Sequence, residues 1–177
     1  MYTDKELIER CLENDPRAQE FLYKRFSRRM YGVCLRFARN TLEADDILQE
    51  GFIKVYTFLK DFRQDGSLEG WIRRTIINTA INYYNSKQKE WNETSIDKAE
   101  SYQSTSDDIL EKISTSDLLK LIQELPEGYR MVFNLYIIEG YNHHEIAEML
   151  HISENTSKSQ LSRARTALQE RLTQRKK

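Results

Sequence analysis

The chain has 177 residues, enough for one ordinary domain or two small ones. Its 27 basic and 28 acidic residues nearly cancel, which argues against a protein that binds nucleic acid unaided. Six glycines, two prolines and the lack of alternating apolar runs argue against a β-sheet. The N-terminus is charged, and no apolar run approaches the roughly 20 residues of a bilayer span. We therefore expect an all-α, cytoplasmic protein without membrane insertion.

Four amphipathic helices are predicted in residues 1–90. Apolar residues recur every three or four positions, as in helices that share one core. In the third helix this stripe comprises Ala44, Ile47, Leu48, Phe52, Val55 and Leu59. A residue suited to starting a helix precedes or opens each stripe; in chain order these are Thr3 (in a T-x-x-E capping box), Pro16, Thr41 and Ser67.

The apolar pattern stops between residues 91 and 112, where six acidic and two basic residues give a net charge of −4. Residues 1–90 carry a net charge of +2, and residues 113–177 carry +1. We therefore predict two mildly basic domains joined by an acidic, flexible linker.

The end of the chain reads as a helix, a tight turn and a second helix. Asn142 and Glu145 form a capping pair for the first helix, and Gly140 is a natural C-cap for the helix before it. The second helix would begin near Glu154. This spacing predicts a helix-turn-helix, whose second helix enters the major groove of duplex DNA.

That second helix has a narrow apolar stripe and an outer face of small polar residues and cations. The candidate DNA-contacting residues are Asn155, Thr156, Lys158, Ser159, Ser162, Arg163 and Arg165. Short polar side chains would let the helix lie deep between the phosphates, while the cations bind phosphates or guanine edges. The alternative is an amphipathic terminal helix with a solvated outer face.

A second polar stripe lies along the fourth helix. It includes Arg74, Asn78 and Asn82, and Trp71, Tyr83 and Tyr84 are interleaved with it. Basic, amide and aromatic side chains together suit single-stranded nucleic acid. The preceding loop could accept a flipped base; its residues are Arg63, Gln64, Asp65, Gly66 and Ser67. For Trp71 and one of the tyrosines, packing in the core is the alternative.

The third helix carries an acidic outer face that includes Asp46, Gln49 and Glu50. It is either a solvated surface or a docking face for a basic partner. The three histidines lack metal-ligand spacing, and no phosphate loop or catalytic motif is found, so we expect no enzyme, cofactor or metal site. Cys11 and Cys34 are interpreted as reduced core cysteines.

Three segments in order resemble one protein family: "DDILQEGFIKVY", "FRQDGSLEGWIRRTIINTAINYY" and "LPEGYRMVFNLYIIEGYNHHEIAEMLHISENTSKSQLSRARTAL". They are similar to the sigma-70 bacterial transcription initiation factors, in particular the small extracytoplasmic-function (ECF) group. The resemblance spans roughly residues 5–172 and implies a sigma-2-like domain at 1–90, a linker at 91–112 and a sigma-4-like domain at 113–177.

The resemblance also implies roles for individual residues. The β′ coiled coil of core RNA polymerase would bind Asp46, Gln49, Glu50 and Phe52. The melted minus-ten element would be bound by Arg63, Gln64, Asp65, Ser67, Arg74, Asn78 and Asn82. The duplex minus-thirty-five element would contact the seven polar residues of the last helix, and the β flap of polymerase would contact Leu135, Tyr136 and Ile138. An anti-sigma factor is a usual partner in this group.

Four residues depart from the usual pattern of the family. Ser157 stands where a valine commonly packs, Asn155 and His151 stand where glycine is common, and Gln160 replaces a frequent arginine. These departures leave the base preference open. The leading hypothesis is a promoter-specificity subunit of RNA polymerase. The alternatives are a stand-alone helix-turn-helix regulator and an adaptor that docks helices without reading DNA.

Overall fold

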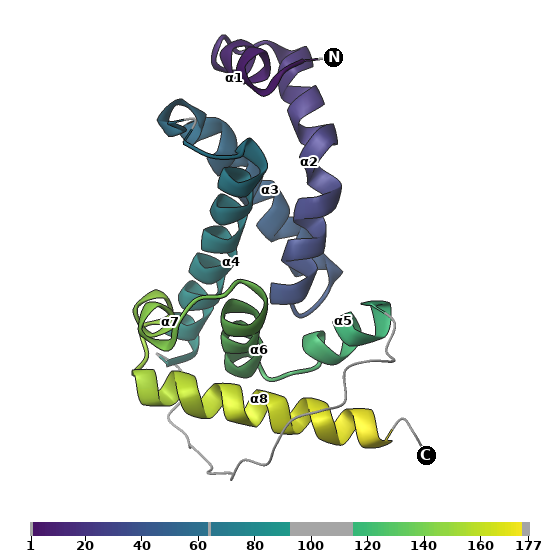
Figure 1. Cartoon of the computed structure of the whole chain (residues 1–177), viewed down its shortest axis with the longest axis vertical. Coiled ribbons are helices and arrows are strands. Elements are labelled where there is room, and N and C mark those ends of the chain that lie inside the picture. Colours follow the sequence, from purple (N-terminus) through teal and green to yellow (C-terminus); the bar gives the residue numbers. More distant parts are fainter. Residues whose placement is uncertain (1, 64, 93–114, 175–177) are drawn as a thin grey trace. The chain divides into compact units, whose positions relative to one another are not determined.

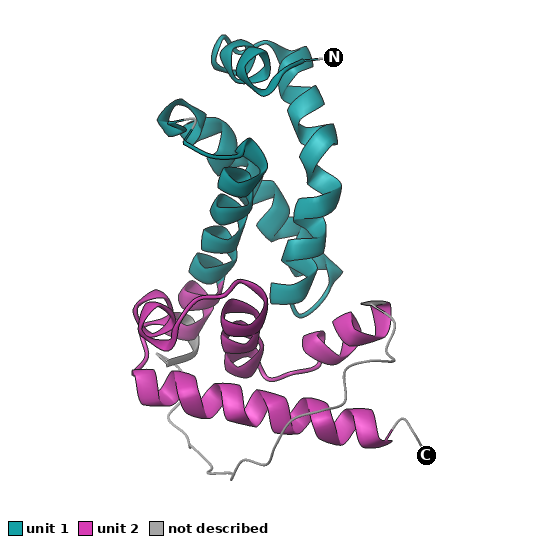
Figure 2. Cartoon of the chain, viewed as in Figure 1, with its two compact units in different colours: residues 1–83 teal, residues 84–177 magenta. Residues whose placement is uncertain are grey.

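A computed structural model describes residues 2–63, 65–92 and 115–174. Every regular element in these three ranges is a helix, which confirms the predicted all-α class (Figure 1). The chain divides into two compact units, Met1–Tyr83 and Tyr84–Lys177 (Figure 2). The predicted linker, 91–112, falls almost wholly within 93–114, outside the described residues, so the predicted domain bounds stay a prediction.

The first unit is built from four helices in chain order. They are α1 (Asp4–Leu12), α2 (Pro16–Phe37), α3 (Thr41–Phe58) and α4 (Leu68–Asn92), whose last turns belong to the second unit. A single 3-10 turn, η1 (Leu59–Asp61), follows α3. The core contains the predicted α3 stripe and residues of its neighbours, among them Leu22, Phe26, Met30, Ile72 and Ile76. At Gly51, an added Cβ would collide with the Ile76 side chain, so α3 and α4 approach closely there.

The residues that cap or begin the helices are those predicted from the sequence, with one exception. The reciprocal capping box of Thr3 and Glu6 is present, and Pro16 is the first residue of α2. The Ser67 hydroxyl accepts a hydrogen bond from the Gly70 amide at 3.0 Å. The predicted cap at Thr41 is wrong by one residue, because the Asn40 side chain accepts from the backbone N–H of Glu43 at 2.9 Å.

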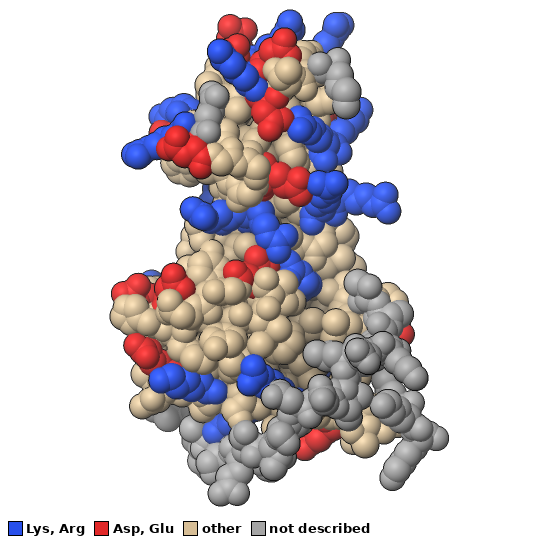
Figure 3. Space-filling view, in the orientation of Figure 1, with Lys and Arg blue, Asp and Glu red and all other residues tan. Residues whose placement is uncertain are grey.

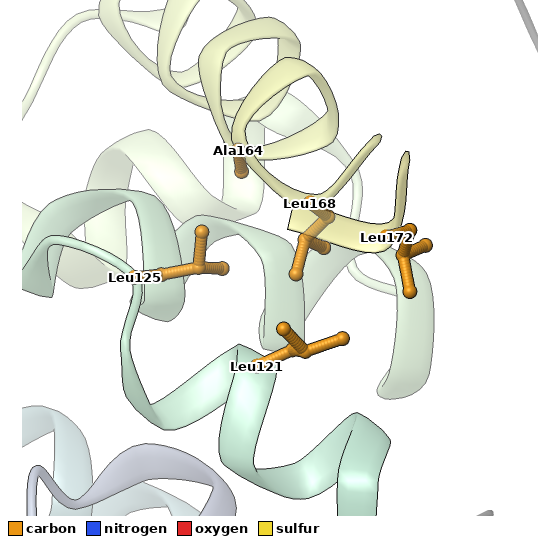
Figure 4. Close-up of a cluster of buried hydrophobic side chains, with 5 residues drawn as sticks. All are labelled: Leu121, Leu125, Ala164, Leu168 and Leu172. Carbon is orange, nitrogen blue, oxygen red and sulfur yellow. The ribbon is translucent and has the colours of Figure 1, made fainter. Parts of the chain in front are cut away.

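The second unit is assembled along one long helix, α8 (Glu154–Gln174), on which three shorter helices pack. These are α5 (Thr115–Gln123), α6 (Glu127–Phe133) and α7 (His143–Leu150); a π-helical turn, η2 (Asn134–Ile138), continues α6. Figure 4 shows a leucine-rich cluster between α8 and the α5 region, made by Leu121, Leu125, Ala164, Leu168 and Leu172.

Arg130 is the one large charged side chain buried in this unit among the described residues. Only 2% of its side chain is exposed, and its Nη1 donates to the carbonyl oxygens of Gln123 and Leu125 at 3.1 and 3.0 Å. These carbonyls lie at the C-terminal end of α5, where no further helical turn satisfies them. Arg130 therefore fixes the connection between α5 and α6.

Candidate nucleic-acid interface

The predicted single-strand stripe is exposed along the first unit's part of α4. Arg74, Asn78 and Asn82 are all exposed, whereas the buried residues of this stretch are Ile72, Ile76, Ile77, Thr79, Ala80 and Ile81. The four-residue spacing places the three polar side chains on one helix face. The structure therefore brings together the basic and amide groups that the sequence predicted.

This stripe leads into a cavity at the start of α4. The cavity has a volume of about 380 Å³, and its lining comprises Asp61, Phe62, Arg63, Asp65, Gly66, Ser67, Gly70, Trp71 and Arg74. Phe62 and Trp71 lie with ring centroids 5.6 Å apart at 48°. Four predicted minus-ten residues thus line one cavity: Arg63, Asp65, Ser67 and Arg74. Gln64 lies outside the described residues.

Trp71 is half-exposed on the cavity wall, so it combines contact with Phe62 and access to solvent. Tyr84 is the tyrosine that is buried, at 8% exposure, whereas Tyr83 is half-exposed. Gly66 has a φ of +149°, a conformation that side chains rarely adopt. A glycine in the loop therefore allows the turn that forms the cavity.

Three of the four residues predicted to dock on core polymerase lie on the surface of α3. Asp46, Gln49 and Glu50 are exposed. Phe52 is only 3% exposed and packs edge-on against Tyr23, with ring centroids 4.8 Å apart. Phe52 therefore belongs to the buried stripe of α3, at its edge, and lies outside the exposed face.

Sequence reasoning missed two apolar residues on this face. Leu42 and Ile53 are 74% and 64% exposed, respectively. They lie four residues before Asp46 and four after Gln49, which places all four on one side of α3. The signal was available, because both fall outside the 3–4 stripe of buried residues. We call the set of Leu42, Asp46, Gln49, Glu50 and Ile53 the α3 face.

The helix-turn-helix forms from α7 and α8. His151 ends α7 in the left-handed conformation, with φ of +55°, and the hydroxyl of Ser153 accepts from the Thr156 amide at 3.0 Å. Ile146, Leu150, Leu161 and Ala164 are buried, whereas Ile152 in the turn is half-buried. The left-handed position explains why glycine would suit residue 151.

The seven predicted residues of α8 differ in access. Those exposed are Asn155, Lys158, Ser159 and Arg165, and those half-exposed are Thr156, Ser162 and Arg163. Arg163 has a buried Nε atom without a hydrogen-bond partner in the described part of the chain. Gln160 packs toward Gly128, where an added Cβ would lie 2.9 Å from its amide nitrogen. Because Gln160 faces α6, the glutamine that stands here in place of the family's frequent arginine does not simply remove a cation from the outer face.

In the segment predicted to bind the β flap, the exposed apolar residues differ from those predicted. Leu135 is fully buried, and the Tyr136 ring is stacked on His143 with centroids 4.4 Å apart. The exposed apolar side chains are Ile137 and Ile138, at 43% and 39%. Only Ile138 of the three predicted residues is therefore an exposed apolar group.

Two consecutive histidines at the start of α7 contact α8, which the sequence did not reveal. His143 Nδ1 lies 2.9 Å from the hydroxyl of the fully buried Ser157. His144 Nδ1 lies 3.1 Å from a carboxylate oxygen of Glu154. The described residues hold no cluster of three or more potential metal ligands, and none of their helices has the length and apolar character to cross a bilayer.

Comparisons with known proteins agree with the all-α, two-unit fold. The chain matches the family models "Sigma-70 region 2" over residues 22–90 and "Sigma-70, region 4" over residues 115–168. It is 29% identical over 180 residues to the RNA polymerase sigma-H factor of Pseudomonas aeruginosa, covering 96% of this chain and 93% of that protein. It is 30% identical over 177 residues to the ECF RNA polymerase sigma-E factor of Escherichia coli, covering 94% and 92%, respectively.

A solved structure shows the same fold. The sigma factor RpoE of Bartonella quintana, crystallised in complex with the anti-sigma factor NepR, has a TM-score of 0.52 and 17% sequence identity. The likeness covers 87% of this chain and 96% of that one. From its relatives and both family models, the chain belongs to the ECF group of the sigma-70 family, the RNA polymerase sigma factors that direct transcription initiation.

Proposed function

We propose that the cavity at the start of α4 holds an unpaired base of the minus-ten element. The single observation that supports this most is that the exposed Arg74, Asn78 and Asn82 stripe runs into a cavity walled by Phe62 and Trp71. An extruded base needs an aromatic surface to stack on and polar groups for its edge. Arg63 and Arg74 supply positive charge for the flanking phosphates.

The α3 face is the proposed contact with the β′ coiled coil of core polymerase. Exposed apolar side chains beside carboxylates suit a partner helix that carries both apolar and basic groups. Leu42 and Ile53 would be removed from water on binding, and Asp46 and Glu50 would meet the basic groups. Ile137 and Ile138 are the corresponding proposal for the β flap.

Duplex minus-thirty-five DNA is the proposed ligand of α8. Lys158 and Arg165 are exposed beside short polar side chains, a combination that suits close approach to the major groove.

The surface charge of the chain favours weak DNA binding by each unit alone. Figure 3 shows basic and acidic side chains interspersed over one face of the first unit, without a large basic field. Weak DNA binding by each unit would become useful when polymerase carries both, through effective concentration.

In this proposal the protein performs no covalent chemistry. Its binding energy positions polymerase and traps one strand. An anti-sigma factor is a proposed regulator by analogy with the Bartonella quintana protein, which was crystallised with one. The α3 face, with two large apolar side chains exposed, is a surface that such a partner would cover.

Two other functions were considered from the sequence. A stand-alone helix-turn-helix regulator would need only the second unit, and it leaves the cavity and stripe of the first unit unexplained. An adaptor that never reads DNA predicts that Arg163→Ala and Asn78→Ala are silent.

A reconstituted transcription assay with core polymerase tests the proposal. We expect the wild-type chain to bind core and to direct initiation at promoters found by mapping transcript starts after overexpression. Asn78→Ala should reduce initiation without weakening core binding. Failure of the chain to bind core would refute the proposal, and tight specific duplex binding without polymerase would favour the stand-alone regulator.

A further inference from the structure

A half-buried polar contact joins the two helices of the helix-turn-helix. His143 is the first residue of α7, and its Nδ1 lies 2.9 Å from the hydroxyl oxygen of Ser157 on α8. Ser157 is 0% exposed. The Tyr136 ring stacks on the imidazole, with the two ring planes 22° apart. The imidazole is therefore fixed between η2 and α8.

The direction of this hydrogen bond follows from the partners available. In the part of the chain that the structure describes, His143 is the one hydrogen-bond partner found for the Ser157 hydroxyl. A buried O–H group without an acceptor costs free energy. A neutral imidazole that accepts at Nδ1 satisfies this group and carries its own proton on Nε2.

The surroundings favour the neutral ring. Burial lowers the pKa of His143 below its usual 6.5, and the positive charges of Lys158 and Arg165 lower it further. The Glu154 carboxylate acts in the opposite direction. Tyr136, the remaining neighbour from another element, contributes its ring face. The imidazole is consequently neutral near pH 7.

We propose that His143 is a positioning residue for the duplex-reading helix and acts through Ser157 while its imidazole is neutral. Ser157 lies in the first turn of α8, among Thr156, Lys158 and Ser159. Movement at residue 157 would displace the neighbouring side chains that are proposed to face DNA. This inference rests on the proposed function of α8.

The contact between His143 and Ser157 depends on pH because the imidazole titrates. An apolar contact at the same place would not depend on pH. Protonation turns Nδ1 from an acceptor into a donor and leaves the buried Ser157 O–H without its acceptor. This O–H to Nδ1 bond is therefore present above the pKa of His143 and is lost as pH falls through it. A protonated ring also adds a positive charge near DNA, which tightens binding. The ratio of wild-type to Ser157→Val affinity separates the two effects, because both proteins gain that charge.

The test is a double-mutant cycle with holoenzyme. The probe is a duplex oligonucleotide with the upstream element of a promoter from which wild-type holoenzyme initiates. The variants are Ser157→Val, His143→Phe, which keeps a ring against Tyr136, and the double variant. At about pH 7.5 we expect each single variant to bind about 3- to 10-fold more weakly, and the double variant to be no weaker than either.

The pH profile and a conservative variant distinguish positioning from a general structural role. Between about pH 7.5 and 5.5, the wild-type to Ser157→Val affinity ratio should fall toward one. His143→Asn offers a carbonyl acceptor that does not titrate, so it should retain binding. Its affinity ratio to the His143→Asn/Ser157→Val double variant, which also lacks the imidazole, should be the same at both pH values. Thermal unfolding confirms that every variant is folded.

Two outcomes would overturn the inference: additive losses in the cycle, or a wild-type to Ser157→Val ratio that does not change with pH. Either would leave duplex binding by wild-type holoenzyme intact. A failure of the proposed function looks different, because wild-type holoenzyme itself would then show no preference for the upstream duplex over a scrambled one.

Discussion

The helices α4 and α8 both present polar faces, yet they are built from different side chains. The α4 face ends in a cavity of about 380 Å³ that is walled by Phe62 and Trp71. The α8 face has hydroxyl and amide groups with exposed cations, and the serine beneath them, Ser157, is fully buried. The difference lies in side-chain size and surface shape more than in charge.

In the proposed function, this difference lets one near-neutral chain bind two forms of DNA. A base taken out of the stack needs a concave aromatic site. An intact duplex needs a protruding helix whose small side chains do not hold the phosphates away. Substitutions that remove one feature at a time should therefore affect strand opening and duplex binding separately.

Loss of a core side chain should have the greatest effect, on the stability of the first unit. Phe52→Ala should destabilise the first unit by about 3–5 kcal/mol, because it leaves a cavity beside Tyr23 and Tyr56. Its neighbour Ile53 is 64% exposed, and Ile53→Ala should change stability by no more than about 0.5 kcal/mol while weakening core binding. Calorimetric unfolding and core-binding titrations measure the pair. Equal stability of the two variants would contradict the assignment of Phe52 to the core.

Trp71→Ala should reduce strand opening about 10- to 100-fold, because stacking of one base is worth roughly 1–3 kcal/mol. Permanganate reactivity of the unpaired strand measures opening, and binding to the upstream duplex measures the α8 contribution. Trp71→Phe keeps an aromatic wall beside Phe62 and should retain most of the opening. If duplex binding fell as much as opening, the two faces would not act separately.

Glu50→Lys should weaken core binding by at least about fivefold through charge reversal at the interface. Opening and duplex binding should then fall together, because both depend on polymerase. Glu50 pairs with Lys54 at 2.6 Å on the surface, so stability should change little. Glu9→Lys is a matched control, because Glu9 also pairs with a lysine four residues away, at 4.0 Å on α1. An equal loss in both variants would point to net charge alone.

The smallest expected effect concerns a single cation of α8. Arg165→Ala should weaken holoenzyme binding to the upstream duplex and lower the slope of log affinity against log salt by about 1. Capture of the unpaired strand should be unaffected in a promoter that is supplied with its bubble already melted. Lys120→Ala removes another exposed cation, on α5, and serves as the control. An unchanged salt slope for Arg165→Ala would place Arg165 away from phosphate.

Much of each helix could be predicted because local rules act within a few residues. The reciprocal cap at Thr3 and the capping box at Asn142 depend on neighbours three positions away. The third-helix stripe identified its buried residues by period alone. That period also put Phe52 in the core, whereas the resemblance assigned it to docking; the structure agrees with the period.

The sequence was sufficient to predict the all-α class, the amphipathic faces and the exposed stripe of Arg74, Asn78 and Asn82, because spacing along a helix decides which residues share a side. Tertiary packing alone brings Phe62 and Trp71 to the wall of one cavity and His143 to Ser157. These contacts join residues 9 and 14 positions apart on different elements, so their geometry depends on how loops end and how helices pack. No periodic pattern carries that information.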